Sequence, residues 1–279
     1  MSASSTPTTP DGAAARAPVP ILRRHLADGA RSLLGWAVAI CAVLALYLPI
    51  YPSLQTPEIA GIIDTLPEDL VTVMGYDQIA TGAGYTQATF FGLLGFVLGA
   101  IAAIAWGARF IAGMEESGRL ELTVAHAVGR VQYAAESAAA LLSRVMILSV
   151  ATVVMLAAFT PVFDLGLTLG NILAATTAWA GLVLLAGTAA LATGALTGRS
   201  TSALAAGAAV AAAGYALNAV GNMSTSLNWL HYLSPYHWAF GNAPLSQGWD
   251  WGGLTLLWVL SAALVAVACV ALSRRDIGR

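Results

Sequence analysis

A short charged segment interrupts an otherwise apolar chain. Its residues, Glu115-Glu116-Ser117-Gly118-Arg119-Leu120-Glu121-Leu122, include four charged side chains, although charged residues make up only 9% of the whole sequence. Carboxylates and a guanidinium at this spacing suit charge-assisted hydrogen bonds and ion pairs with another polypeptide. Because long apolar stretches flank the segment on both sides, we predict that another protein binds a membrane protein at this place.

The composition requires a membrane as the solvent. Hydrophobic residues make up 58% of the chain and the mean hydropathy is +0.76, both above the range of soluble domains. Six uncharged stretches are each long enough to cross about 30 Å of hydrocarbon at about 1.5 Å per residue. They are 32–51, 88–106, 145–163, 172–196, 201–223 and 251–272. We therefore predict an all-α polytopic membrane protein with six transmembrane helices.

The distribution of charge predicts the orientation. All twelve basic residues are arginines, and with six spans every one of them falls on the same side of the membrane as both termini. Basic residues near span ends are retained in the cytoplasm, so we predict a multi-pass protein of the cell (plasma) membrane with both termini cytoplasmic. The opposite loops carry only acidic residues: Glu58, Asp64, Glu68, Asp69, Asp77, Asp164 and Asp250.

Outside the spans, the chain divides into polar and amphipathic segments. Residues 1–20 are rich in Ser, Thr, Pro and Ala and predict a disordered cytoplasmic tail, whereas 21–279 form one six-helix transmembrane domain. Residues 21–31 predict a short basic amphipathic helix on the inner leaflet. The outer loop 52–87 predicts two short amphipathic helices, which serve either as a lid over an exit path or as interfacial packing.

A second outer loop, 224–250, gathers aromatic residues such as Trp229 and Trp238. Amphipathic rings prefer the level of the lipid headgroups. The loop therefore predicts a re-entrant or interfacial hairpin, broken at Pro235 and Pro244.

Few residues could hold a metal ion. His231 and His237 are six positions apart, a spacing that suits neither a helix nor a strand for shared ligation, so we interpret them as interfacial polar groups. Cys41 and Cys269 lie inside apolar spans, where a thiol behaves as a small hydrophobic group. The sequence therefore predicts no metal site.

Glycines recur at regular intervals in two spans. Small residues let helices approach closely in a membrane, where no hydrophobic effect drives them together. We interpret these glycines first as helix contacts and second as a cavity wall: Gly95 and Gly99 in the second span, and Gly207, Gly214 and Gly221 in the fifth.

The segment 107–144 is too long for a simple turn between the second and third spans, and we predict that it lies in the cytoplasm. After Gly118, polar residues recur with helical spacing: Arg119, Thr123, His126 and Arg130. This pattern predicts an amphipathic coupling helix over 115–131, across the base of the bundle. Its glutamates make it a poor ligand for an anionic leaflet and favour a protein partner.

We predict that the chain does not supply its own energy. It contains no lysine, the residue with which a Walker-type loop reaches the terminal phosphates of ATP. The six uncharged stretches contain no Asp or Glu, although ion-coupled transporters usually place ionisable groups at this depth. Arg144 lies close to the inner boundary, and we expect its side chain to extend to the headgroups.

The charged segment resembles the coupling segment of the type-2 permease family of ATP-binding-cassette (ABC) transporters, the six-helix membrane subunits of type V exporters. The similar residues are 113–122, followed by Ala125 and by Gly129-Arg130 before a long span. Residues 232–238 with Pro244-Leu245, and 90–94, are also similar to the family pattern. The resemblance covers nearly the whole chain.

The resemblance implies two membrane subunits, identical or sister chains, and two separate ABC ATPase subunits that bind ATP and Mg. This chain would then bind no cofactor itself. The residues that would seat in a cleft of the ATPase are Glu115, Glu116, Gly118, Arg119, Glu121 and Arg130. The family places the second and fifth spans beside the central pathway, so the side chains expected to face substrate are Phe90, Phe91, Phe96, Tyr215, Asn218 and Asn222.

We therefore predict the permease subunit of an exporter for an amphipathic or hydrophobic antibiotic, drug or lipid, with no covalent chemistry and no nucleic-acid partner. One alternative is an ATPase-independent secondary transporter or channel. Another is an intramembrane hydrolase that uses Ser234 and His237, which the sequence supplies without a visible third catalytic member.

Overall fold

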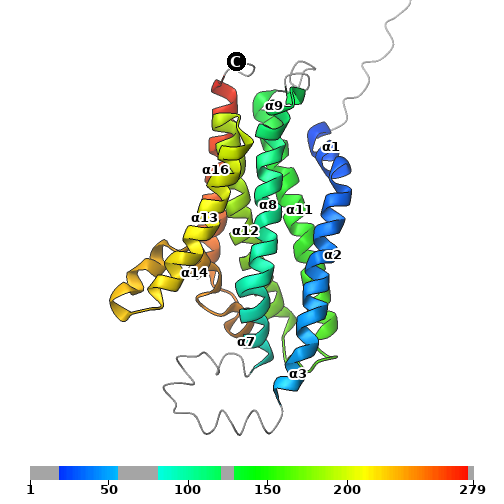
Figure 1. Cartoon of the computed structure of the whole chain (residues 1–279), viewed down its shortest axis with the longest axis vertical. Coiled ribbons are helices and arrows are strands. Elements are labelled where there is room, and N and C mark those ends of the chain that lie inside the picture. The colour runs from blue at the N-terminus through cyan, green and yellow to red at the C-terminus, as the bar shows by residue number, and fades with distance from the viewer. Residues whose placement is uncertain (1–18, 56–80, 121–128, 276–279) are drawn as a thin grey trace, which may run out of the picture.

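The computed structural model describes residues 19–55, 81–120 and 129–275, and within these ranges the secondary structure is entirely helical. Six helical segments are long and apolar enough to cross a membrane (Figure 1). They are Ala30–Leu54, Gly82–Glu116, Arg130–Phe159, Leu169–Thr197, Ser200–Gly221 and Trp251–Arg274. The all-α, six-span prediction is confirmed.

The fourth span, α12 (Leu169–Thr197), forms the centre of the bundle. It contacts the second, third, fifth and sixth spans, whose main helices are α8 (Gly95–Ala108), α11 (Arg130–Phe159), α13 (Ser200–Gly221) and α16 (Trp251–Arg274). The first span begins with α2 (Ala30–Tyr47), continues through η1 (Leu48–Ile50) and α3 (Tyr51–Leu54), and packs mainly against α11. Trp179 of α12 is completely buried and donates its indole N–H to the Gly95 carbonyl, 2.9 Å away.

Glycines set the distance between α8 and α12. A β-carbon at Gly99 would lie 2.5 Å from the Trp179 ring, and one at Gly107 would lie 2.2 Å from the Gly187 carbonyl oxygen. Both distances are far below van der Waals contact, so the two backbones approach closely only because these positions lack side chains.

The second span is one uninterrupted helical segment with a π-helix toward each end. It runs through α7 (Gly82–Thr86), the π-helix η2 (Gln87–Leu94), α8, the π-helix η3 (Arg109–Gly113) and α9 (Met114–Glu116). A switch from α to π hydrogen bonding leaves a backbone carbonyl without its usual partner, and such segments frequently lie at functional sites. Tyrosine hydroxyls from other elements donate to a carbonyl of each segment: Tyr236 to Gly92 at 2.7 Å in η2, and Tyr133 to Phe110 at 2.8 Å in η3.

The N-terminal helix α1 (Pro20–Asp28) packs against α11, with Ile21 buried, whereas the sequence predicted a helix lying on the leaflet. Both ends of α1 are held by side chains of α11. Glu136 accepts hydrogen bonds from the Ile21 and Leu22 N–H groups at 2.7 and 3.0 Å, and Arg144 donates to the His25 carbonyl. An anion at the N-terminus and a cation near the C-terminus both complement the helix dipole.

The prediction for Arg144 is wrong, and the helix of the third span extends beyond the uncharged stretch 145–163. Because α11 begins at Arg130, the third span includes Glu136 and Arg144, which are only 6% and 4% exposed. Arg144 does not extend to the headgroups: its guanidinium carbon lies 5.1 Å from the Trp106 ring centre and 4.8 Å from that of Phe110. These cation–π contacts and the His25 carbonyl hold the charge inside the protein.

The predicted coupling helix over 115–131 is not one helix. Its first residues belong to α9, which ends at Glu116, and its last residues belong to α11. Gly118 has a φ of +69°, a conformation that breaks a helix, and Gly129 is extended. Residues 107–116 and 130–144 extend the second and third spans instead of forming a separate segment, and 121–128 lie outside the described residues.

The hairpin after α13 breaks where the sequence predicted. It consists of η4 (Thr225–Leu233), α14 (Pro235–Phe240) and α15 (Pro244–Gln247), and each of the last two helices begins at its proline. The hydroxyl of Ser234 accepts from the His237 N–H at 3.1 Å and donates to the Gly214 carbonyl at 2.7 Å. Ser234 therefore caps α14 and fastens the hairpin to α13.

Candidate functional site

The helix bundle has two chemically distinct ends. We call one the arginine end: α1, α9 and the last turn of α16 lie there, at the top of Figure 1. The opposite end, which carries α3, α7 and the hairpin 224–250, is the hairpin end. Each end holds a cluster of polar contacts beside the second span.

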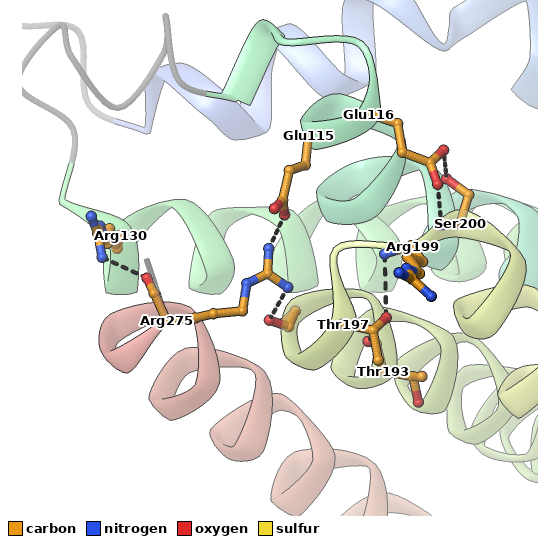
Figure 2. Close-up of polar contacts among 9 residues, drawn as sticks. Glu115, Glu116, Arg130, Thr193, Thr197, Arg199, Ser200 and Arg275 are labelled. Carbon is orange, nitrogen blue, oxygen red and sulfur yellow. Dashed lines mark hydrogen bonds and ion pairs between the residues drawn. The ribbon is translucent and has the colours of Figure 1, made fainter. Parts of the chain in front are cut away.

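At the arginine end, Glu116 binds the first residue of α13. Its carboxylate accepts hydrogen bonds from the Ser200 N–H at 2.8 Å and the Ser200 hydroxyl at 2.6 Å (Figure 2). The side chain of Arg199, the residue before α13, makes no capping hydrogen bond. Glu116 therefore satisfies a backbone donor that the helix leaves open, and it joins the end of the second span to the start of the fifth.

Arg275, just beyond α16, joins three other helices at the same end. Its guanidinium forms an ion pair with Glu115 and donates to the Ala195 carbonyl of α12 at 3.0 Å (Figure 2). Its own carbonyl accepts from Arg130 of α11 at 2.7 Å. The Arg275 and Glu115 side chains are only 22% and 19% exposed, so this contact is partly shielded from water. At Arg275 the ends of four spans meet: the last turns of the second, fourth and sixth spans and the first turn of the third.

Two adjoining cavities lie between the second and fifth spans. The apolar groove, of about 340 Å³, is lined by Leu93, Phe96, Val97, Ala100, Ile101, Ile104, Ala208, Ala211, Ala212 and Tyr215. The polar cavity, of about 480 Å³, lies nearer the hairpin end and is lined by Gln87, Ala88, Gly92, Leu93, Tyr215, Asn218, Asn222, Tyr236, His237, Phe240 and Gly241. Leu93 and Tyr215 line both, so the two spaces adjoin.

Stacked histidines border the polar cavity. The His231 and His237 ring centres are 4.1 Å apart, with planes 7° from parallel. His231 Nε2 lies 2.9 Å from Asn222 Oδ1, and His237 Nδ1 lies 3.1 Å from Asn218 Oδ1. Burial, and secondarily the neighbouring His231, lowers the pKa of His237, which favours the neutral ring. Within the described ranges, no three His, Cys, Asp or Glu side chains are placed to hold a metal ion.

Comparison with known proteins identifies the family. A family model described as "Multidrug efflux system permease Rv1217c, C-terminal domain" matches residues 28–272, most of the chain. The chain belongs to this family. It is therefore a multi-pass membrane permease of multidrug efflux. A search of curated proteins gives no match.

The residues predicted to contact an ATPase lie in different surroundings in the permease. Glu115, Glu116 and Arg130 come together around Arg275 and Ser200, inside the same chain. Gly118 lies in the exposed turn after α9, Arg119 is exposed at the start of the helical residues 119–120 that follow this turn, and Glu121 lies outside the described residues. Contact of any of them with an ATPase stays a prediction.

Four of the six residues predicted to face substrate line the cavities of the permease: Phe96, Tyr215, Asn218 and Asn222. Phe90 and Phe91 do not, because they are 1% and 0% exposed and pack against each other, and Phe91 also packs against Phe240. Contact of any of these side chains with substrate stays a prediction.

Four of the five predicted packing glycines lie where another helix approaches, at different distances. A β-carbon at Gly207 would lie 2.9 Å from the Ala186 carbonyl oxygen, and one at Gly221 would lie 2.6 Å from the His231 ring. At Gly95 it would meet Phe90 of the same span at 2.8 Å, whereas at Gly214 the nearest atom, in Pro235, is 3.4 Å away. Gly99, described above, makes the closest approach of these five.

Sequence reasoning missed Arg275, Ser200 and the histidine stack. Two weak signals pointed to the first two: an arginine pair follows the last apolar stretch, and Ser200 follows Gly198-Arg199 where a helix restarts. The stack had no such signal. It forms because the chain turns at Ser234-Pro235 between η4 and α14, so a six-residue spacing brings the rings face to face.

Proposed function

We propose that this permease is the membrane subunit of an ABC exporter of the type-2 kind, driven by separate ATPase subunits and paired with a second permease, identical or a sister chain. The observation that carries this proposal is the contact network of Glu115 and Glu116. It connects the first two residues of the predicted coupling segment with α13, α16 and, through Arg275, with α11 and α12.

The network supports a specific way of transmitting force. The segment from Ser117 to Gly129 joins α9 to α11, and the arginine end faces the cytoplasm if basic residues mark that side. Movement of α9 by a bound ATPase would pull α13 through Ser200 and α16 through Arg275. The ATPase would then shift the bundle between two arrangements by the difference in its contacts with each. ATP and Mg would be bound by the partner and not by this chain.

The cargo we propose is an amphipathic or hydrophobic compound, such as an antibiotic, drug or lipid. The apolar groove between α8 and α13 supports this class, because the residues lining it expose almost only hydrocarbon and aromatic surface.

One observation favours ion coupling as the second candidate, since Glu136 is a buried acid within the third span. Its carboxylate, however, accepts hydrogen bonds from Ile21 and Leu22 of α1 and from Gln132 at 2.7 Å. These partners indicate that the Glu136 carboxylate holds α1 against α11. Efflux from proteoliposomes that contain the permease without any ATPase would establish this second candidate.

The test of the first candidate is assembly with an ATPase. The permease is co-expressed with an ABC ATPase, taken from the neighbouring reading frame where that frame encodes one, and ATPase retained on the affinity-purified permease is measured. We expect Glu121→Arg to lower the retained ATPase about tenfold or more, because a reversed charge at a protein interface costs several kcal/mol. Glu58→Arg, the same change in the predicted outer loop, is the control and should retain as much as the natural permease. Equal retention by Glu121→Arg and the natural permease would contradict the proposal.

A further inference from the structure

The apolar groove and the polar cavity follow each other along the second and fifth spans. Phe96 and Ile104 of α8 and Ala208 of α13 line the groove, whereas Gln87 and Asn218 line the cavity. Tyr215 lines both and is 43% exposed. A molecule that occupies both spaces therefore contacts hydrocarbon along one part and hydrogen-bonding groups along the other.

The polar cavity offers hydrogen bonds without charge. None of the described residues that line it is Asp, Glu, Lys or Arg, and the lowered pKa of His237 keeps this ring neutral near pH 7. The Gln87 amide oxygen accepts from the Leu245 N–H at 3.3 Å, but its amide nitrogen is buried without a hydrogen-bond partner. A donor in this state is costly, and a small rearrangement toward a bound acceptor would satisfy it.

The absence of charge in this lining selects among polar groups. A cation or anion entering the cavity would lose hydration without gaining a counter-charge, which is expensive away from water. A hydroxyl, glycosyl or amide group loses less and regains hydrogen bonds from amide, phenol and imidazole side chains. The discrimination between charged and uncharged ligands follows from the residues that line the polar cavity. The apolar groove would accept any apolar tail.

We propose that the groove and the polar cavity form one binding site for an amphiphile whose polar end is uncharged and hydrogen-bonding, with Gln87, Asn218 and His237 selecting that end. Only one part of this inference rests on the proposed export function, namely that the bound molecule is cargo. Binding itself requires neither ATP nor an ATPase.

The experiment compares three photoaffinity probes in lipid nanodiscs that contain the full chain. Each probe has a dodecyl chain with a diazirine, and the polar end is glucosyl, trimethylammonium or sulfate. Labelled residues are located by peptide mass spectrometry, with unlabelled dodecyl glucoside as competitor. We expect competable labelling of α8 and α13 beside the groove, about three- to tenfold stronger for the glucosyl probe than for either charged probe, as one or two hydrogen bonds would give.

Replacing an amide with a carboxylate in the polar cavity tests whether the cavity selects the polar end of the ligand. Gln87→Glu keeps the acceptor for Leu245 and adds a negative charge to the cavity, so trimethylammonium labelling should rise and sulfate labelling should fall, each about threefold or more. Gln247→Glu, the same change at an exposed position of α15, is the control and should change neither. If Gln87→Glu does not fold, Asn218→Leu provides the second measurement: it should lower glucosyl labelling about threefold, whereas Asn242→Leu outside the polar cavity should not.

Three results would overturn the site: equal labelling by the three probes, labelling spread over α2 and α16 as for a lipid, or a Gln87→Glu pattern no different from that of Gln247→Glu. Such a result with normal ATPase retention leaves the exporter proposal standing. Selective labelling without ATPase retention contradicts only the exporter proposal.

Discussion

The second span ends in two different kinds of polar contact. At the arginine end, Glu115 and Glu116 bind Arg275 and Ser200 through charged hydrogen bonds. At the hairpin end, the contacts of η2 are neutral: the Gly92 carbonyl accepts from Tyr236, and the Gln87 amide accepts from Leu245. Each end includes a π-helix, η3 at the arginine end and η2 at the hairpin end. The same backbone irregularity therefore occurs beside charged contacts at one end and beside neutral contacts at the other.

The difference teaches where this permease places charge. Charged hydrogen bonds are stronger than neutral ones, but they carry a large desolvation cost in a dry site. Glu115 and Arg275 stay about one fifth exposed, where that cost is moderate, and they fasten several spans together. Beside the cavities the permease uses tyrosine, asparagine, glutamine and neutral histidine, which leave the space open to an uncharged ligand. This distribution of charge supports the two proposals made above, that the arginine end transmits movement and that the cavities receive a molecule.

The largest effect should come from removing the arginine that joins the spans. Arg275→Ala loses the ion pair with Glu115 and the hydrogen bond to Ala195, and it leaves a partly buried carboxylate unpaired, at a cost of about 3 kcal/mol. Thermal unfolding of the purified permease, followed by tryptophan fluorescence, should show a clearly lower midpoint. Arg274→Ala changes the exposed neighbouring arginine and should shift the midpoint little. Equal shifts of the unfolding midpoint for the two variants would show that the contacts of Arg275 do not stabilise the arginine end.

A second effect follows from the titration of His25, which contacts Phe110 at the arginine end. Burial, followed by the charge of Arg144, lowers the pKa of His25 from 6.5 to about 4. Since the docked state disfavours the protonated ring, docking of α1 is strongest above pH 6.5 and weakens as the pH falls toward about 4. At about pH 5 the loss should be about 2 kcal/mol, or roughly thirtyfold in the docking equilibrium.

Hydrogen exchange of the α1 amides at a series of pH values measures this effect, after correction for the intrinsic pH dependence of exchange. His25→Gln should exchange equally across the range, because its side chain does not titrate. His237→Gln changes the histidine at the hairpin end and should leave the acid sensitivity of α1 intact. Acid-sensitive exchange that persists in His25→Gln would assign the effect to another group.

Much of the fold followed from the sequence because its causes are local. Uncharged length predicted six spans, and Pro235 and Pro244 predicted the breaks in the hairpin. The central position of α12 did not follow, because a central span and a peripheral span are equally apolar in a membrane protein. Gly181, Gly187 and Gly194 of α12 carried a signal, since small residues on a span favour contact with several neighbours.

The polar sites were harder to predict because their partners are distant in the chain. Glu115 and Glu116 were recognised as important, but Arg275 is 160 residues away and Ser200 is 84 residues away. Apolar length alone also placed the end of the second span too early and the start of the third span too late, since helices continue beyond the hydrocarbon wherever other helices cover them. Glu136 and Arg144 are tolerated in α11 for this reason, as α1 covers them.

The smallest effects should come from changing to phenylalanine each of the two tyrosines that donate a hydrogen bond to a π-helix. Tyr133→Phe removes the donor to the Phe110 carbonyl, where Tyr133 is 1% exposed, so the carbonyl stays unsatisfied at a cost of about 1–2 kcal/mol. Tyr236→Phe removes the donor to Gly92 beside the polar cavity, where water can replace it, and should cost less than about 1 kcal/mol. Thermal midpoints of the two variants measure the difference. A larger loss of stability for Tyr236→Phe than for Tyr133→Phe would contradict this expectation. It would mean that η2 at the hairpin end depends on its tyrosine hydroxyl more than η3 does.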